Sequence, residues 1–513
     1  MAKRNVAVCL LVLVEAARLA GAERINQEGR ILGPPPVVTN AILFNTTDAD
    51  AVVSATQILP ATNPWNEDAT RRPVLTNSDA MIAQISADLL ASRQTLRLFQ
   101  EMNFVLAPDS QPLVPIQFVD YPDESDLNGG ASPYGRYPIP ASLPIEGWPT
   151  ETGGETLAEV QEDALGLGGD RHSIIVQPGS GAVWETWQAS RSGTNWQASN
   201  GAIFNLNTNG LRPAGWTSGD AAGLPMFPAL VRFDECERGM VEHACRLVVK
   251  RTRYRTYLYP ATHYAAPSAN TNVDLPAMGQ RLRLKAGFVI PVTWTEQEKA
   301  LLLGLKKYGA LVADNGNFFS ISITPDDRWA AGAFDHISSI GTTDFEVIQT
   351  TGANEGPRSP GAPTANAGPD QLLPISRTVQ LQGVVSYTGA SPVVQWKLYS
   401  GPGTVTFGNA TQTNTTVTFS SPGIYTLMLS ADDAVHAVAY DAVVFTETDS
   451  CSVSITRAGT NVNLAWQGGT PPFVVQWADA LSVASWSGVA TTSQQSATLP
   501  ITRTMGVFRV QSQ

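Results

Sequence analysis

Short apolar runs alternate with polar residues along most of the chain, and turn-forming residues separate one run from the next. Alternation of this kind over about four to eight residues predicts half-buried strands. In the N-terminal part we expect strands at residues 114–119, 173–176, 182–187, 230–233, 244–249, 256–259 and 282–289. The sequence Pro-Gly-Ser-Gly lies between the second and third of these runs, so those two predict a β-hairpin.

Two segments have helical spacing instead. Ser78 or Asp79 precedes apolar residues that recur at helical intervals to about Glu101, which predicts a long amphipathic helix. Thr295 and Glu298 have the spacing of a capping box, so a second helix is expected from there to about Lys307.

The last third of the chain contains two further groups of strands. Within residues 364–447, apolar and polar residues alternate at 379–383, 393–398, 415–419 and 425–429, and turn-forming residues recur about every ten positions. Residues 451–513 show the same pattern of short alternating runs. A Gly- and Pro-rich linker at 352–363 precedes them. We therefore expect a mainly β, multidomain chain. An N-terminal mixed α+β domain at 40–350, with a β-sandwich-like core and two helices, is followed by two small immunoglobulin-like β-sandwiches.

Charge limits the expected partners. Charged residues make up 15% of the 513 residues, and the net charge is −12. Nucleic acids and anionic membranes bind basic surfaces, so neither is an expected partner. Arg251, Arg253 and Arg255 are an exception, because alternation places them on one strand face. This face is either solvated or part of a groove for an anionic ligand.

The N-terminus has the pattern of an export signal over residues 1–22. Lys3 and Arg4 precede an apolar run at 6–14, and Ala20-Gly21-Ala22 offers a cleavage site. No later segment has about 18 consecutive apolar residues, so no transmembrane segment is expected after cleavage. The pattern predicts an extracellular or cell-surface protein, and nothing in it sets the oligomeric state.

Three cysteines follow the cleavage site. Cys236 and Cys245 flank a short stretch that has the composition of a hairpin tip, so a disulfide between them is expected in an exported protein. Cys451 is left over, as a free thiol. No group of Cys and His residues has zinc-site spacing, and no metal site is expected.

Residues 364–447 resemble PKD-type domains. Ala365-Asn366-Ala367-Gly368-Pro369-Asp370-Gln371 matches the entry motif of that family, and Trp396 and the run 419–425 match its later landmarks. The resemblance implies an immunoglobulin-like stalk, spacer or adhesion module of an exported protein, of a kind often joined to glycan-active enzymes. Some members hold calcium through acidic loops, but residues 384–389 contain no acidic residue, which argues against calcium here. No other cofactor is expected.

Residues 60–350 resemble an uncharacterised family of exported bacterial proteins. The segments that carry the resemblance are 63–66, 123–126, 169–172, 211–218 and 313–316. The resemblance implies no activity.

No standard catalytic motif is present, so the candidate catalytic residues come from clustering alone. Histidines and carboxylates gather in the central region, and a carboxylate beside an imidazole suits general acid–base work. The candidates are Asp170, His172, Asp234, Glu235, His263 and Asp314. Four of them also have a structural explanation: Asp170 and Asp314 suit turns, and Asp234 and Glu235 suit a solvated hairpin.

Four tryptophans crowd one stretch that is rich in asparagine: Trp184, Trp187, Trp196 and Trp216. Aromatic rings can cover the apolar face of a sugar while amides bond its hydroxyl groups. The alternative is that these tryptophans belong to the core.

Two functions remain open. The first is a secreted polysaccharide-active protein, a glycan hydrolase or lyase with a PKD-type accessory module. The second is a non-catalytic surface or adhesion protein that binds glycans. A domain of about 300 residues exceeds what a simple binding module needs, which favours the first function. That function requires the candidate catalytic residues to converge on one site.

Overall fold

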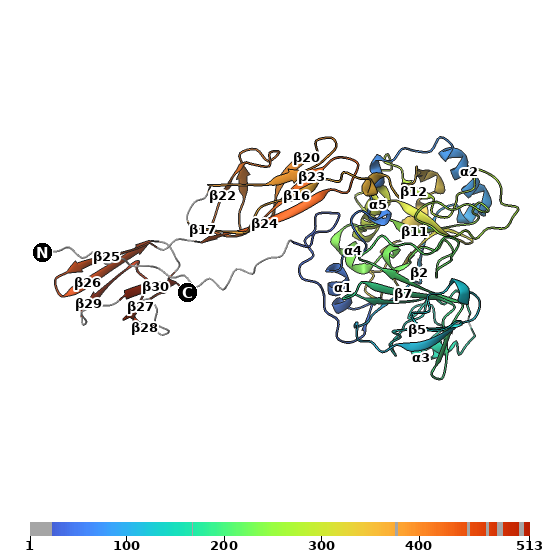
Figure 1. Cartoon of the computed structure of the whole chain (residues 1–513), viewed down its shortest axis with the longest axis horizontal. Coiled ribbons are helices and arrows are strands. Elements are labelled where there is room, and N and C mark those ends of the chain that lie inside the picture. Colours follow the sequence, from blue (N-terminus) through green and yellow to red (C-terminus); the bar gives the residue numbers. More distant parts are fainter. Residues whose placement is uncertain are drawn as a thin grey trace.

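The computed structural model describes residues 23–166, 168–374, 378–448, 452–467, 471–479, 486–501 and 507–512. Figure 1 shows three parts in a row: an N-terminal domain, a first β-domain at 364–448 and a second β-domain at 452–512. The expected export signal and Cys451 lie outside the described residues. In the described part of the chain, no helix is long and apolar enough to cross a membrane.

The larger sheet of the N-terminal domain has the strand order β15-β12-β13-β11-β14-β2. Its strands are β2 (Leu96–Gln100), β11 (Cys245–Val249), β12 (Arg281–Leu284), β13 (Ala310–Asn315), β14 (Phe319–Ile323) and β15 (Phe345–Val347). β11 pairs in parallel with β13, and β14 pairs in parallel with β2. Sheets with parallel pairs are covered on both faces, and accordingly every residue of β14 is buried.

A second sheet has the order β1-β3-β6-β7-β10. Its strands are β1 (Ile42–Leu43), β3 (Val105–Leu106), β6 (Ser173–Gln177), β7 (Ala182–Trp187) and β10 (Asn200–Asn205). The expected hairpin is confirmed, because β6 and β7 pair in antiparallel fashion. One core joins the two sheets: Ile174 and Val183 of this sheet belong to the same buried cluster as Leu247 and Ile321 of the larger one.

A third, four-stranded sheet lies at one end of the N-terminal domain, with the order β5-β4-β9-β8. Its strands are β4 (Val114–Phe118), β5 (Tyr134–Tyr137), β8 (Ser190–Ser192) and β9 (Asn195–Ala198). The domain is thus a mixed α/β unit with several sheets.

The helices differ from the expectation in number and length. In the described part of the chain they are α1 (Thr47–Ser54), α2 (Ser78–Asp88), α3 (Leu157–Glu162), α4 (Phe233–Arg238) and α5 (Glu296–Lys307). The second expected helix is confirmed as α5. Its capping box is present, because Thr295 Oγ1 accepts from Glu298 N at 3.1 Å and Glu298 Oε2 accepts from Thr295 N at 3.0 Å.

The first expected helix was too long. α2 ends at Asp88, and Leu89 already has extended backbone angles. Residues 96–100 form strand β2, in which Leu98 lies opposite Ile321 of β14. The apolar residues at 96 and 98 therefore follow strand alternation, and pairing with β14 overrides the apparent helical spacing.

Two of the expected strands are not formed, and each is represented by an isolated β-bridge only. At 230–233, Val231 makes only an isolated bridge with Ile323, and α4 begins at Phe233. At 256–259, Tyr257 makes only an isolated bridge with Met278. A further expected strand, at 282–289, ends already at Leu284.

The disulfide expectation is wrong in this structure. Cys236 lies in helix α4 rather than on a hairpin strand, Cys245 begins β11, and both are free, fully buried thiols. Burial raises the pKa of both thiols, so the reactive thiolate is strongly disfavoured.

We therefore expect neither Cys236 nor Cys245 to react with a water-soluble aromatic disulfide reagent in the folded protein, and both to react in denaturant. Labelling followed by peptide mass spectrometry measures this. A disulfide-linked pair of peptides from the non-reduced protein would contradict the expectation.

The first β-domain contains sheets with the orders β16-β19, β17-β24-β23-β20 and β18-β22-β21. Its strands are β16 (Thr364–Asn366), β17 (Gln371–Pro374), β18 (Thr378–Gln380), β19 (Val384–Ser386), β20 (Val393–Ser400), β21 (Val405–Phe407), β22 (Thr416–Phe419), β23 (Gly423–Asp432) and β24 (Ala439–Thr448). Trp396 is buried in its core together with Phe419 and Tyr425. The strands expected in this segment from sequence alternation are present.

The second β-domain has two three-stranded sheets, β25-β26-β29 and β28-β27-β30. Its strands are β25 (Ser452–Ala458), β26 (Asn461–Gln467), β27 (Phe473–Ala478), β28 (Ser487–Thr492), β29 (Ser496–Pro500) and β30 (Val507–Ser512). Trp466 and Phe473 pack edge to face between the sheets. The chain therefore ends in two small, mainly antiparallel β-sandwich domains.

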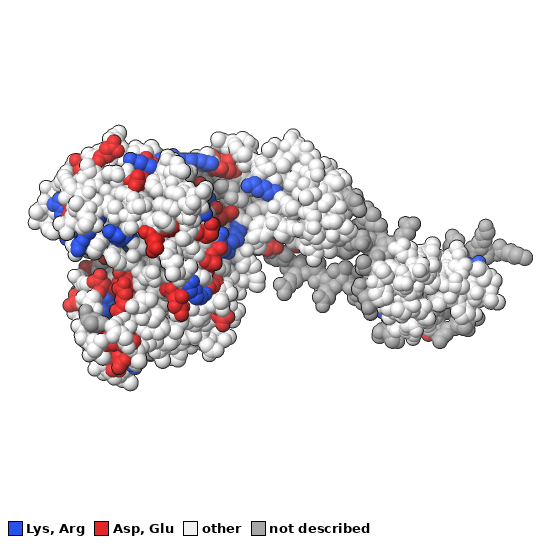
Figure 2. Space-filling model, turned by 180° about the vertical axis from the view of Figure 1, so that it is seen from behind, with Lys and Arg blue, Asp and Glu red and all other residues white. Residues whose placement is uncertain are grey.

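The first β-domain is docked on the N-terminal domain. Arg71 forms an ion pair with Asp432 at 2.8 Å, and Tyr399 accepts a hydrogen bond from Ile31 N at 3.1 Å. Ser359 of the expected linker contacts His436. In the view of Figure 2, charged side chains gather on the N-terminal domain, and both β-domains are nearly uncharged. Charge-dependent chemistry is therefore sought in the N-terminal domain.

Candidate acid–base site

A network of charged side chains lies where the two large sheets of the N-terminal domain meet. We call it the buried ionic network, and it consists of Glu101, Glu146, His172, Glu185, Asp220, Arg246 and Asp314. His172 immediately precedes β6, and Glu185 lies on β7 of the smaller sheet. Arg246 and Asp314 come from β11 and β13 of the larger one. The packing of the two sheets thus brings together residues that are far apart in sequence.

Arg246 is the centre of the network and is 3% exposed. It makes two contacts of 3.1 Å with the carboxylate of Asp220, and its Nη2 lies 2.9 Å from Asp314 Oδ2. Nη1 donates to Ser322 Oγ at 3.2 Å. Burial alone would lower the pKa of Arg246. Asp220 and Asp314 raise this pKa by more than burial lowers it, so the guanidinium stays charged.

His172 and Glu146 form a second pair. His172 Nδ1 lies 2.8 Å from Glu146 Oε2, and Nε2 lies 2.8 Å from the carbonyl oxygen of Gly219. Both partners are acceptors, so both ring nitrogens donate and the imidazole is cationic. Burial opposes this charge, but Glu146 raises the pKa of His172 to about 9. The pKa of Glu146 is lowered, because the contact with His172 outweighs the effect of burial.

The other carboxyl groups hold their protons more strongly than usual. Burial raises the pKa of Glu185 to about 7, although the backbone N–H groups of Phe227 and Met226 oppose the shift. Burial likewise raises the pKa of Asp314 to about 6, against the effect of Arg246. The network has five carboxyl groups and only two cations. Glu185 and Asp314 are therefore partly protonated near neutral pH, as the carboxyl groups of acid–base sites often are.

Asp314 connects the network to solvent, because 24% of its side chain is exposed. His263 is linked to β13 only through the backbone of Ala222: His263 N donates to Ala222 O at 3.2 Å, and Ala222 N donates to Ala313 O at 3.0 Å. His263 Nδ1 donates to Ala221 O at 2.7 Å. Nε2 has no hydrogen-bond partner among the described residues.

Asp170 is exposed and lies two residues from His172. Its Oδ1 accepts a weak hydrogen bond from Trp187 Nε1 at 3.4 Å. The Trp187 ring lies 6.1 Å from that of Tyr121, which is 41% exposed. Of the expected catalytic residues, His172 and Asp314 belong to the buried ionic network, and Asp170 is close enough to raise the pKa of His172 slightly. Among the described residues, His263 makes no hydrogen bond or ion pair with a side chain of the network. The catalytic role of these residues stays a prediction.

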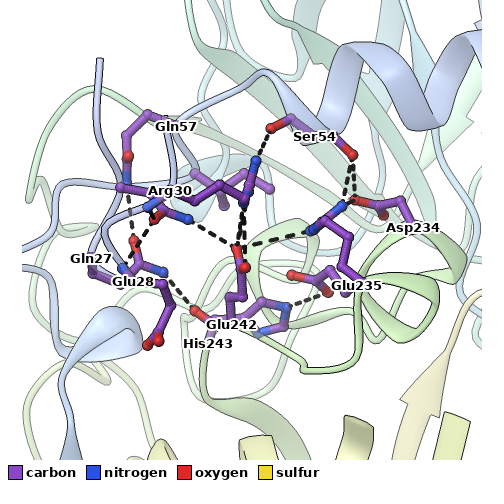
Figure 3. Close-up of polar contacts among 12 residues, drawn as sticks. Gln27, Glu28, Arg30, Ser54, Gln57, Asp234, Glu235, Glu242 and His243 are labelled. Carbon is purple, nitrogen blue, oxygen red and sulfur yellow. Dashed lines mark hydrogen bonds and ion pairs between the residues drawn. The ribbon is translucent and has the colours of Figure 1, made fainter. Parts of the chain in front are cut away.

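Asp234 and Glu235 belong to a different cluster, shown in Figure 3. Both lie on α4, and Arg232 contacts them at 3.3 and 2.6 Å. Glu235 also lies 3.1 Å from His243 Nε2, and despite burial Arg232 and then His243 lower its pKa to about 2. These two candidates are not solvated hairpin residues, and they do not converge with the others.

The same cluster fixes the start of the described chain. Glu242 contacts Arg30 at 3.0 Å and accepts from Asn26 at 2.9 Å, and Ser54 of α1 donates to Asp234 at 3.1 Å (Figure 3). Asp234, Glu235 and Glu242 each have a guanidinium partner. Such compensation stabilises packing and leaves no group poised for proton transfer.

The tryptophans divide into two kinds. Trp184 and Trp196 are 8% and 7% exposed and belong to the core between the sheets, as the structural alternative held. Trp187 and Trp216 are partly exposed, and Arg212 lies 5.4 Å from the Trp216 ring. Only Trp187 and Trp216 can offer a face to a sugar.

Sequence reasoning missed Glu101, Glu146, Asp220 and Arg246. Arg246 could have been identified from the sequence, because it lies inside the apolar run 244–249 and a buried charge there needs a partner of opposite charge. Glu101 was assigned to the end of a helix that does not extend so far. Among the described residues, no group of His, Cys, Asp and Glu is arranged to hold a metal ion.

Comparison with known proteins bears on the C-terminal part. No curated protein matches the chain. Among solved structures, the chain is similar to the PKD domain from the KIAA 1837 protein, at 25% identity over 19% of this chain and 98% of that one, with a TM-score of 0.16. It is also similar to a crystal structure of domains from titin, at 12% identity over 30% of this chain and 68% of that one, with a TM-score of 0.15.

The family comparison is more specific. Residues 367–446 match a protein family described as a PKD domain. The matched range lies within the first β-domain and agrees with the resemblance found in the sequence. The first β-domain is therefore a PKD domain, a module typical of extracellular and cell-surface proteins.

Proposed function

We propose that this chain is an extracellular polysaccharide-active protein whose N-terminal domain cleaves glycans by acid–base catalysis. The observation that carries the proposal is Asp314, a partly exposed carboxyl group with a pKa of about 6 that is held by Arg246 of the buried ionic network. A group with this pKa can donate a proton near neutral pH. The PKD domain supports the extracellular setting.

In this mechanism Asp314 protonates the glycosidic oxygen as the bond breaks, and His263 Nε2 takes a proton from the attacking water. Arg246 holds Asp314 in place through its 2.9 Å contact, and Asp220 fixes Arg246. Burial, and then the carboxylate of Asp220, hold the pKa of Asp314 at about 6 against the effect of Arg246, so part of the Asp314 population carries a proton near neutral pH.

The test is a screen of the exported protein against plant, algal and microbial polysaccharides for released oligosaccharides. We expect Asp314→Asn to reduce release by about 10²–10⁴-fold, because it removes the general acid. Asp327→Asn, which alters an exposed carboxylate outside the network, is the control and should leave release unchanged. Undiminished release by the Asp314 variant would refute its role, and a protein that neither releases nor retains any glycan would refute the proposed function.

A non-catalytic glycan-binding function is the second candidate, and the exposed Tyr121–Trp187 pair beside Asp170 favours it. Aromatic faces next to polar groups suit sugars without any need for cleavage. Retention on insoluble glycan without product release, lost on Trp187→Ala, would support this function over the first.

A further inference from the structure

Several cations of this acidic chain make no ion pair among the described residues, and four of them lie on or next to β2 or in the segment that follows β11. They are Arg93, Arg97, Lys250 and Arg255. Arg93 Nη1 donates to Asn317 O at 3.4 Å, and Lys250 also hydrogen-bonds Asn317. Arg97 lies on β2 opposite Ser320 of β14. The turn from β13 to β14 is therefore bordered by positive charge that no carboxylate neutralises.

This positive border is continuous with the aromatic side chains next to His263. Asn315, directly after Asp314, donates to Ala265 O, and its own Oδ1 is buried without a partner in the part of the chain that the structure describes. Tyr264 stacks on His263 at 5.7 Å and meets Tyr254 edge to face at 5.5 Å. The rim of the acid–base site thus runs from Asn317 past Asp314 to the tyrosine pair.

Arg255 occupies the far end of this rim. It is exposed, lies 5.2 Å from the Tyr254 ring and hydrogen-bonds the Tyr264 side chain. Its φ of 50° is in the left-handed region, which is unfavourable for a non-glycine residue. Strained positions of this kind gather at ligand sites, and the strain presents this guanidinium beside two aromatic faces.

We propose that the ligand of this site is an anionic polysaccharide, with Arg255, Lys250 and Arg93 binding its acidic groups. This inference rests on the proposed function and adds the substrate class to it. An arginine fork matches a carboxylate or sulfate group, and tyrosine rings cover the apolar face of the sugar. The chain as a whole repels polyanions, so binding has to be local to this rim.

The test uses matched polymers that differ only in charge. Retention of the full exported protein is compared on polygalacturonate and on its methyl ester, and on a sulfated galactan and its unsulfated form. We expect binding to the charged forms only, with an affinity that falls as salt rises. The two polymer pairs show whether carboxylate or sulfate groups are recognised.

The variant is Lys250→Gln combined with Arg255→Gln. Its control is Lys397→Gln, an exposed lysine of the PKD domain with no ion pair among the described residues. We expect the double variant to weaken binding about tenfold or more and the control to bind as the unmodified protein does. Circular dichroism and thermal melting verify that the double variant is folded.

The outcomes separate the two proposals. Equal binding to charged and neutral polymers, or unchanged binding by the double variant, overturns the anionic-ligand inference and leaves the proposed function standing. Equally tight binding of duplex DNA at the same salt also overturns it, by showing general polyanion attraction. Failure to bind or cleave any polysaccharide overturns both.

Discussion

Replacing Arg246 with methionine should destabilise the N-terminal domain by about 3–5 kcal/mol. Methionine preserves much of the buried stem but removes the cation that compensates Asp220 and Asp314, and Asp220 is only 1% exposed. Breaking one partner of a buried ion pair leaves an uncompensated charge in the core. Urea unfolding, combined with hydrogen exchange of the β11 and β13 peptides, measures the loss.

Arg71→Met is the matched control, because Arg71 also pairs with an aspartate but its side chain is 54% exposed. Exposed pairs contribute about 0–1 kcal/mol. Adding Asp220→Asn to the Arg246 variant should recover part of the stability, since it removes one of the stranded charges. Similar losses for the Arg246 and Arg71 variants would show that Arg246 is not the centre of the network.

Stability should fall as pH rises from about 5 to about 9, and Glu185→Gln should flatten much of this decline. The folded-state pKa of Glu185 is about 7, above the usual 4.5, so the folded state keeps a proton that the unfolded state releases. The contribution of this proton to the free energy of unfolding is complete below the usual pKa of 4.5 and is lost as pH rises through about 7. The shift corresponds to roughly 3 kcal/mol.

His172 acts in the same direction at higher pH, because its contribution is lost as pH rises through about 9. Glutamine at 185 can still accept from the Met226 and Phe227 backbone N–H groups, so the fold is preserved. Urea unfolding across this pH range measures the effect. Glu296→Gln, at a side chain that is 76% exposed, is the control. An unchanged slope in the Glu185 variant would contradict the assignment.

Local patterns predicted the parts of the fold that depend on local interactions. The capping box at Thr295 and Glu298 and the hairpin of β6 and β7 are close in sequence, so their signals are visible without a structure. The strands of the PKD domain were predicted for the same reason, since they follow one another in short antiparallel pairs. β2 was not, because its partner β14 lies more than two hundred residues away.

The candidate site shows the same limit. Asp170, His172, His263 and Asp314 were chosen for residue type, and the parallel pairing of β11 with β13 is what places Asp314 beside Arg246. Asp234 and Glu235 are of the same residue type but lie on α4, which the sequence did not indicate as a helix. Residue type is visible in a sequence, whereas convergence depends on strand pairing across long distances.

The docking of the PKD domain has a mechanical consequence. Arg71 and Ile31 of the N-terminal domain and Ser359 of the linker contact it at separate points, so a hinge motion between the two parts has to break these contacts. A force that separates the two parts would act on the segment around Ile31, because Ile31 N donates to Tyr399 and the neighbouring Arg30 is paired with Glu242 of the N-terminal domain.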